Sequence, residues 1–122
     1  MKVTILGSGP SSGVPTIHDG WAECDPNNNK NRRLRPSLLI ESCDTVVLVD
    51  TSPDLRQQLL NCEVRKLDSV LYTHAHADHL HGIDDLRSIN RAMNAEIPVY
   101  ADANTLEAIN KRFEYTLTPL AP

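Results

Sequence analysis

The stretch that most constrains this chain is a run of histidines between residues 74 and 81. Four of the five histidines in the 122-residue sequence lie there, after a short apolar segment at 69–73 that is typical of a buried strand. Ligand-type side chains at every second position project to the same side of an extended backbone. Imidazole and carboxylate suit zinc, so the run predicts a metal site rather than a polar loop that is histidine-rich by chance. The candidate ligands are His74, His76, Asp78 and His79.

Length and composition fit a single globular domain. Hydrophobic residues make up 40% of the chain and charged residues 23%. The net charge of −4 gives no support to a nucleic-acid surface. Three cysteines without close pairing favour a reducing compartment. No apolar run is long enough for a membrane span or a signal peptide, so we expect a cytoplasmic protein without a membrane partner.

The N-terminal region predicts a strand over residues 3–6 and then a long loop. Residues 7–15 contain three glycines, two prolines and three serines, which is typical of a loop. Such a loop can bring its backbone close to an anion or simply connect two elements. If it faces a substrate, the candidate contacts are Gly9, Ser11, Ser12 and Gly13.

Residues 16–36 are expected to be irregular, because Pro26 and the asparagines at 27–29 preclude regular structure. The basic run at 30–35 is either a solvated face or a phosphate contact, since arginine forks match phosphate oxygens. Arg32 and Arg33 are the candidates for that contact.

The middle of the chain predicts a hairpin followed by a helix. Residues 37–41 and 45–49 form two strands joined by a tight turn at 42–44. The continuous apolar run at 46–49 predicts a strand covered on both faces. Ser52 is expected to cap a helix with Pro53 at its first position, and this helix is expected to end at Asn61.

The remaining elements alternate between helix and strand. Asp84 and Asp85 open a helix, residues 97–101 form an edge strand, and Asp102 or Asn104 caps a last helix with an apolar stripe. The apolar residues of that stripe are Leu106, Ile109 and Phe113, and the tail at 116–122 has no helical period.

This order predicts a layered α/β fold, in which ligands collect beyond the carboxyl ends of the strands. Asp50 and His74 each follow an apolar strand. If those strands are neighbours, Asp50 lies near the histidines. It is then either a metal ligand or, as we favour, an acceptor that orients an imidazole N–H.

These residues also carry a family likeness. The pattern His-x-His-x-Asp-His at 74–79, with Asp50 ending the preceding strand, resembles the metallo-β-lactamase-fold hydrolases. The segments at 6–9, 13–15 and 31–35 resemble more narrowly the PhnP-like phosphodiesterase branch, and the first loop is also similar to the tRNase Z group. The likeness extends from Val3 to about Tyr115.

The resemblance implies an αββα sandwich with a mixed sheet and two metal ions, zinc with manganese or iron as alternatives. His74 and His76 would bind the first metal, and Asp78 and His79 the second, with Asp78 also assigned to catalysis. A metal-bound hydroxide would attack phosphorus, so a small phosphorylated substrate is expected. His81 is expected to be a neighbour of the site, not a ligand.

Two departures from the family limit this assignment. Branch members often carry several cysteines after the first loop, whereas only Cys24 lies there, so no structural zinc site is predicted. The family also takes later metal ligands from its second half, and this chain has no histidine after His81. Each metal would then have at most two protein ligands, where zinc normally has three or four.

We therefore expect residues 1–122 to be a truncated domain, the N-terminal half of such a sandwich. One face of its sheet would then be uncovered, and a missing second half or self-association would have to cover it. The alternatives are a catalytically silent metal-binding or interaction remnant, a tRNase Z-like ribonuclease, and a thioester or lactone hydrolase.

Overall fold

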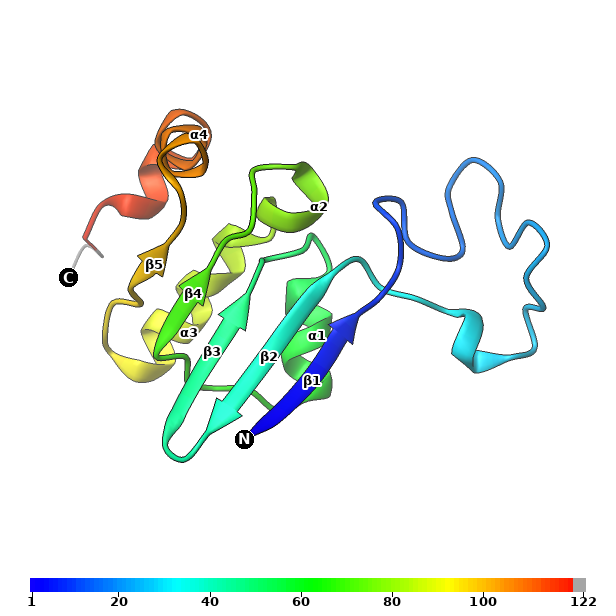
Figure 1. Ribbon diagram of the computed structural model, residues 1–122, viewed down its shortest axis with the longest axis horizontal. Coiled ribbons are helices and arrows are strands. Elements are labelled where there is room, and N and C mark those ends of the chain that lie inside the picture. Colours follow the sequence, from blue (N-terminus) through cyan, green and yellow to red (C-terminus); the bar gives the residue numbers. More distant parts are fainter. Residues whose placement is uncertain (120–122) are drawn as a thin grey trace.

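A computed structural model describes residues 1–119 of the chain as one mixed sheet with helices packed against it (Figure 1). The strand order is β1-β2-β3-β4-β5. The strands are β1 Lys2–Gly7, β2 Ser37–Ser42, β3 Thr45–Val49, β4 Ser69–Leu71 and β5 Val99–Tyr100. The predicted α/β class with a mixed sheet and covering helices is confirmed.

The first three strands form an antiparallel meander. β1 pairs with β2, and β2 pairs with β3 through the predicted hairpin. Cys43 sits in the turn with φ of 51°, the left-handed conformation that such a tight connection requires. The apolar alternation of β1 and β2 matches this half of the sheet.

The last two strands run parallel to β3, and helices connect them. α1 Leu55–Asn61 joins β3 to β4, while α2 Ala77–Leu80, a 3₁₀ turn at Ile83–Asp85 and α3 Leu86–Met93 join β4 to β5. α4 Ala103–Phe113 follows β5, and a 3₁₀ helix covers Glu114–Leu117. β5 is an edge strand, as predicted.

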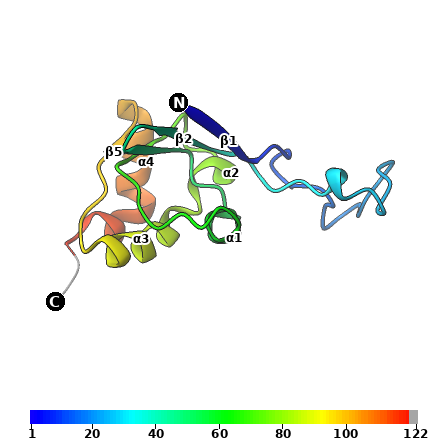
Figure 2. The ribbon, with the colours of Figure 1, turned by 90° about the horizontal axis from the view of Figure 1, so that it is seen from below.

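The core lies between the sheet and the layer of α1 and α3. Leu39, Leu48 and Val70 are in register across β2, β3 and β4, and all three are buried. Leu55 of α1 and Ile89 of α3 belong to the same buried cluster. Figure 2 shows both helices on one side of the sheet.

The opposite face of the sheet carries apolar side chains that remain exposed. The register places Val3, Ile5, Leu71 and Tyr100 on this face, alternating with the buried leucines. Ile5 is 69% exposed and Tyr100 58%. The prediction that residues 46–49 are covered on both faces was therefore wrong, because in this strand only Leu48 is buried and its neighbours line the open face.

Residues 8–36 form an arm that projects from the body in both views (Figures 1 and 2). Its two sides are joined near the base by an isolated bridge between Val14 and Arg33. The prediction of an irregular segment missed a short 3₁₀ turn at Asn29–Asn31, where the Asn28 side chain accepts from the Lys30 N–H.

Two details of the helices differ from the predictions, and one agrees with them. α1 begins at Leu55, two residues after Pro53, because the Ser52 hydroxyl accepts from the Asp54 N–H in a preceding turn. Asp102 caps α4 as predicted, by accepting from Thr105 N–H. Leu106 is 44% exposed, and Thr105 is buried in its place.

Of the tail predicted to lack helical structure, Thr116 and Leu117 belong to the last 3₁₀ helix, while residues 120–122 lie outside the described part. Within residues 1–119, none of the helices is long and apolar enough to cross a membrane.

Candidate metal centre

The candidate centre lies where two parallel neighbours, β3 and β4, end. Their pairing brings Asp50, which follows β3, next to Thr73 and His74, which follow β4. Parallel strands present their carboxyl ends at one edge of a sheet, which explains why residues 23 positions apart meet here. The expectation that β3 and β4 are neighbours is confirmed.

Asp50 is the buried acceptor at the centre of this cluster. Its side chain accepts hydrogen bonds from the Thr73 N–H at 2.8 Å, the Thr73 hydroxyl at 2.7 Å and His79 Nδ1 at 2.7 Å. The residue is only 5% exposed, and its φ of 60° lies in the left-handed region that aspartate tolerates better than most residues. In this backbone conformation the carboxylate points toward residues 73–79.

These bonds fix the tautomers of two histidines. An ionised carboxylate only accepts, so His79 carries its proton on Nδ1 and leaves Nε2 with a free lone pair. The Thr73 hydroxyl donates its only proton to Asp50, so in its contact with His74 at 2.9 Å it accepts from Nδ1–H. His74 therefore also leaves Nε2 unprotonated, as a metal ligand requires, and this atom accepts a hydrogen bond from His76 Nδ1–H at 3.1 Å.

The atoms that could bind a metal lie in two pairs, and His76 Nδ1 would release the proton that it donates to His74 when a metal binds. His74 Nε2 is 3.1 Å from His76 Nδ1, and His79 Nε2 is 3.4 Å from Asp78 Oδ2. Zinc–nitrogen bonds of ~2.0–2.1 Å in a tetrahedral shell hold neighbouring donor atoms ~3.3–3.4 Å apart. Each pair thus has the spacing of one edge of such a shell.

The pairs are half shells, since no three ligand-type side chains among residues 1–119 converge on a point that could hold a metal. Three rings are close together, with centroids 4.1 Å apart for His74 and His79 and 4.6 Å apart for His74 and His76. The donor chemistry fits zinc, and the donor count fits part of a shell that other groups complete.

The structure corrects one step of the argument for Asp78. The extended alternation that was expected to continue through residue 78 stops at His76, and Asp78 lies in the first turn of α2. Asp78 and His79 are consecutive residues on this helix, so their spacing follows from the helix and not from a strand.

A buried network that the sequence analysis missed holds α2 in place. Thr51 has an exposed fraction of 0%; its N–H donates to the His79 carbonyl at 2.8 Å and its hydroxyl donates to the Leu80 carbonyl at 3.0 Å. The Tyr72 hydroxyl in turn donates to Thr51 Oγ1 at 3.0 Å, and burial raises the pKa of Tyr72, so it stays protonated. The available signal was the position of Thr51 and Tyr72 beside the two strand ends.

Two residues that follow α2, His81 and Gly82, pack against other parts of the fold. Gly82 packs so tightly against Ser52 that a Cβ would overlap the Ser52 carbonyl oxygen. The His81 ring lies against Phe113 of α4 with centroids 5.2 Å apart. That His81 is not a metal ligand stays a prediction.

Backbone N–H groups of the loop at 7–15 form hydrogen bonds within the protein. The Gly9 N–H donates to the Leu34 carbonyl and the Gly13 N–H to the Pro10 carbonyl, so neither N–H faces a ligand. Ser11 and Ser12 are exposed. Contact of this loop with a substrate stays a prediction that concerns these two serines most.

The arginines of the basic run are divided among different partners. Arg33 donates to the Ser8 hydroxyl at 3.0 Å, and the Arg32 guanidinium lies 5.1 Å above the Trp21 ring on the arm. Arg35 forms a two-pronged pair with Asp54 at the start of α1. Phosphate contact by Arg32 and Arg33 stays a prediction.

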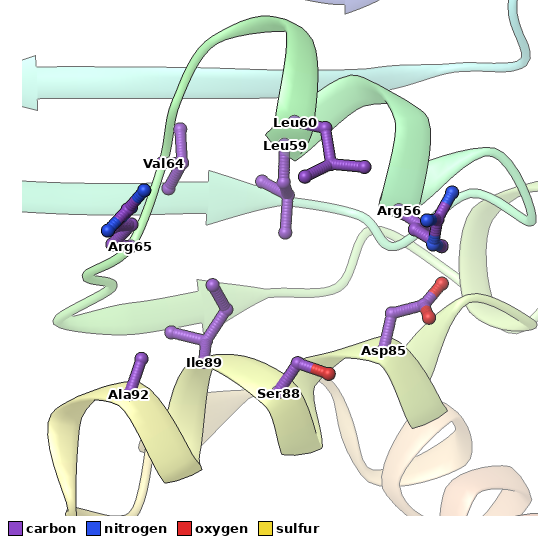
Figure 3. Close-up of a pocket in the computed structure, with 9 residues that line it drawn as sticks. All are labelled: Arg56, Leu59, Leu60, Val64, Arg65, Asp85, Ser88, Ile89 and Ala92. Atoms are coloured by element: carbon purple, nitrogen blue, oxygen red, sulfur yellow. The ribbon is translucent and has the colours of Figure 1, made fainter.

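A separate cavity of about 390 Å³ lies between α1 and α3. In Figure 3, Leu59 and Ile89 point toward one another across it, and Arg56 faces Asp85 at one end. Its lining holds one metal-type ligand, Asp85. This cavity therefore offers no group of metal ligands, whereas the histidine run brings several together.

Comparison with known proteins agrees with this geometry. A family model described as a β-lactamase superfamily domain matches residues 45–121, which include β3, Asp50 and the whole histidine run. The chain belongs to the metallo-β-lactamase superfamily. The resemblance inferred from the sequence is thereby confirmed.

The relatives are considerably longer than the part they share with this chain. A diphosphatase of the PhnP family is 42% identical with a TM-score of 0.86, over 93% of this chain and 46% of its own. An octanoyltransferase of Porphyromonas gingivalis is 42% identical over 94% of this chain and 23% of that protein. The chain thus spans less than half of either relative.

A human tRNase Z, short form, shares the fold at a TM-score of 0.68 and 22% identity, over 98% of this chain and 42% of its own. The superfamily and the partial fold are therefore established, with a PhnP-family diphosphatase among the relatives.

Proposed function

We propose that this chain provides the metal-binding half of a hydrolase that cleaves phosphorus esters or anhydrides. The observation that carries the proposal is the tautomer arrangement at Asp50. One carboxylate and one hydroxyl, from Asp50 and Thr73, leave the Nε2 atoms of His74 and His79 unprotonated, as metal binding requires. Orientation of imidazoles by hydrogen bonds from neighbouring side chains is typical of metal sites.

In this proposal, His74 and His76 hold one zinc ion, and Asp78 and His79 hold a second. Zinc in such a site supplies a water of lowered pKa and offsets negative charge on a phosphoryl group. Asp50 and Thr73 orient the two imidazoles, and the hydrogen bonds of Thr51 to the carbonyls of residues 79 and 80 fix the position of α2 relative to the end of β3. Manganese and iron are alternative metals for the same donors.

A phosphorylated small molecule is the proposed substrate. The 42% identity to a PhnP-family diphosphatase supports phosphorus chemistry. A ribonuclease Z of Bradyrhizobium diazoefficiens is 41% identical over 58 residues, 46% of this chain and 19% of that protein. The net charge of −4 disfavours RNA as the substrate, because RNA binding depends on neutralising phosphates.

The open face of the sheet suggests what completes the site. We propose that further polypeptide covers Val3, Ile5, Leu71 and Tyr100, as the part of the relatives beyond the match would allow. The same polypeptide would supply the ligands that the two half shells lack. Self-association of this chain is the alternative way to cover the face.

The test combines metal binding with turnover. Zinc affinity of the chain is measured against a chromophoric chelator, and hydrolysis of bis(p-nitrophenyl) phosphate is followed with zinc bound. His76→Ala removes one donor of the first pair and should weaken zinc binding at least tenfold. His18→Ala, on the exposed arm, is the matched control and should leave zinc affinity unchanged.

Equal losses from both histidine variants would contradict the assigned site. Zinc binding without turnover at any chain concentration would favour the catalytically silent metal-binding module for this chain alone. Absence of zinc binding by the unchanged chain would refute the proposal.

A further inference from the structure

The histidine cluster opens onto a cavity whose opposite wall comes from α4. This cavity of about 350 Å³ is lined on one side by His74 and His76 and on the other by Asp102, Asn104 and Arg112. The sequence analysis described this helix only by its cap and its apolar stripe. Polar side chains from α4 and its cap in fact line the same cavity as one of the two donor pairs.

Arg112 is fixed beside the histidines by one of its own nitrogens. Its Nη1 donates to the Ala75 carbonyl at 2.7 Å, in the loop between the two histidines of the first donor pair. No carboxylate within residues 1–119 forms an ion pair with Arg112. Its positive charge and remaining N–H donors are therefore available to a ligand in the cavity.

Asp102 limits where an anion can sit. Its Oδ1 accepts from the Thr105 N–H at 2.7 Å, and this hydrogen bond lowers the pKa of its carboxyl, so the group is ionised. A negative charge on that side repels anionic groups from it. An anion in the cavity is therefore favoured at the Arg112 side, next to His74 and His76.

We propose that Arg112 binds the phosphoryl group of the substrate and that Asn104 and Asp102 face its uncharged polar part. The proposal rests on the proposed function, because it places the phosphoryl group at the histidine metal centre. A guanidinium fork matches two phosphoryl oxygens, and the anchor at Ala75 lowers the entropic cost of holding the fork in place. The substrate class is a phosphoester or diphosphate with a neutral polar remainder.

The experiment measures anion binding and not turnover. Methylenediphosphonate, a diphosphate analogue that resists hydrolysis, is titrated into the chain with zinc and, separately, with a chelator. The Arg112 Nε–H signal is followed by ¹H–¹⁵N NMR. We expect this signal to shift when the analogue binds. Arg112→Gln should raise the dissociation constant of the analogue about tenfold or more, the effect expected for loss of a charge-assisted hydrogen bond.

Two further variants make the result specific. Lys111→Gln removes the same charge from the neighbouring position of α4, which does not line the cavity, and should leave affinity unchanged. Arg112→Lys keeps the charge without the fork and should give an intermediate affinity.

Equal effects of Arg112→Gln and Lys111→Gln would overturn the proposal, as would an unmoved Arg112 signal at saturating analogue. If zinc binds but Arg112 does not respond, this proposal fails while the metal centre stands. If zinc does not bind, the proposed function fails, and the chelated titration still decides whether Arg112 binds the anion.

Discussion

Replacing Asp50 with asparagine tests how the protein prepares its histidines. Asparagine has the same shape and tolerates the φ of 60° at this position. It can keep the hydrogen bond from the Thr73 N–H on its remaining oxygen. Its amide NH₂, however, faces the Thr73 hydroxyl and His79 Nδ1, both of which donate to the carboxylate in the unchanged protein.

The variant can restore these contacts only by reversing them. The Thr73 hydroxyl rotates to accept, and His79 moves its proton to Nε2 so that Nδ1 accepts. Because most hydrogen bonds are remade, we expect a loss of about 1–2 kcal/mol in the free energy of unfolding. Zinc binding should fall about 10–100-fold, since Nε2 is then protonated and must lose its proton to bind.

The assay is zinc competition against a chelator, with stability measured by urea denaturation on the metal-free chain. Asp68→Asn is the control, because Asp68 accepts from the Val46 N–H at 2.7 Å and pairs with Lys66, far from the histidines. It should alter stability alone. Unchanged zinc affinity in Asp50→Asn would refute the reasoning that Asp50 sets the tautomers.

Two further predictions concern the surroundings of the site. Thr51→Val leaves the Leu80 carbonyl without its hydroxyl donor and should lower the free energy of unfolding by about 1–3 kcal/mol. Thr51→Ser keeps the hydroxyl and should lower it by about 1 kcal/mol, because only a methyl group is lost. Equal losses of the two variants in urea denaturation would contradict the network. The Arg35 hydrogen bonds hold the pKa of Asp54 below its ordinary value, so the pair's contribution is full above about pH 4 and is lost as pH falls through the lower folded-state pKa. Asp54→Asn should therefore be less stable by about 1–2 kcal/mol at pH 7, with a difference that shrinks in acid; a difference independent of pH would contradict this.

Much of the fold followed from local pattern. The strands predicted at 3–6 and 37–41, the tight turn at 42–44 and the cap at Asp102, one of two candidates, all depend on nearby residues, and the structure matches them to within a residue. The place of Asp50 beside the histidines followed from one topological assumption, that β3 and β4 are neighbours.

The missed features depend on contacts between distant segments. The apolar run at 46–49 has the same composition whether one face or both are covered, so it could not reveal the open face of the sheet. The contacts of Thr51 with residues 79 and 80 and of Arg112 with Ala75 join positions 28 or more apart in the chain. No periodicity reports such pairs, because they arise only when the sheet and helices are assembled.

The most direct test of the account is the protonation state of the histidines, read from long-range ¹H–¹⁵N NMR of the metal-free chain and again after addition of zinc. The account predicts Nδ1–H tautomers for His74 and His79, and a large shift of their Nε2 signals when zinc binds. Nε2–H tautomers in the metal-free chain, or Nε2 signals that zinc leaves unmoved, would contradict it.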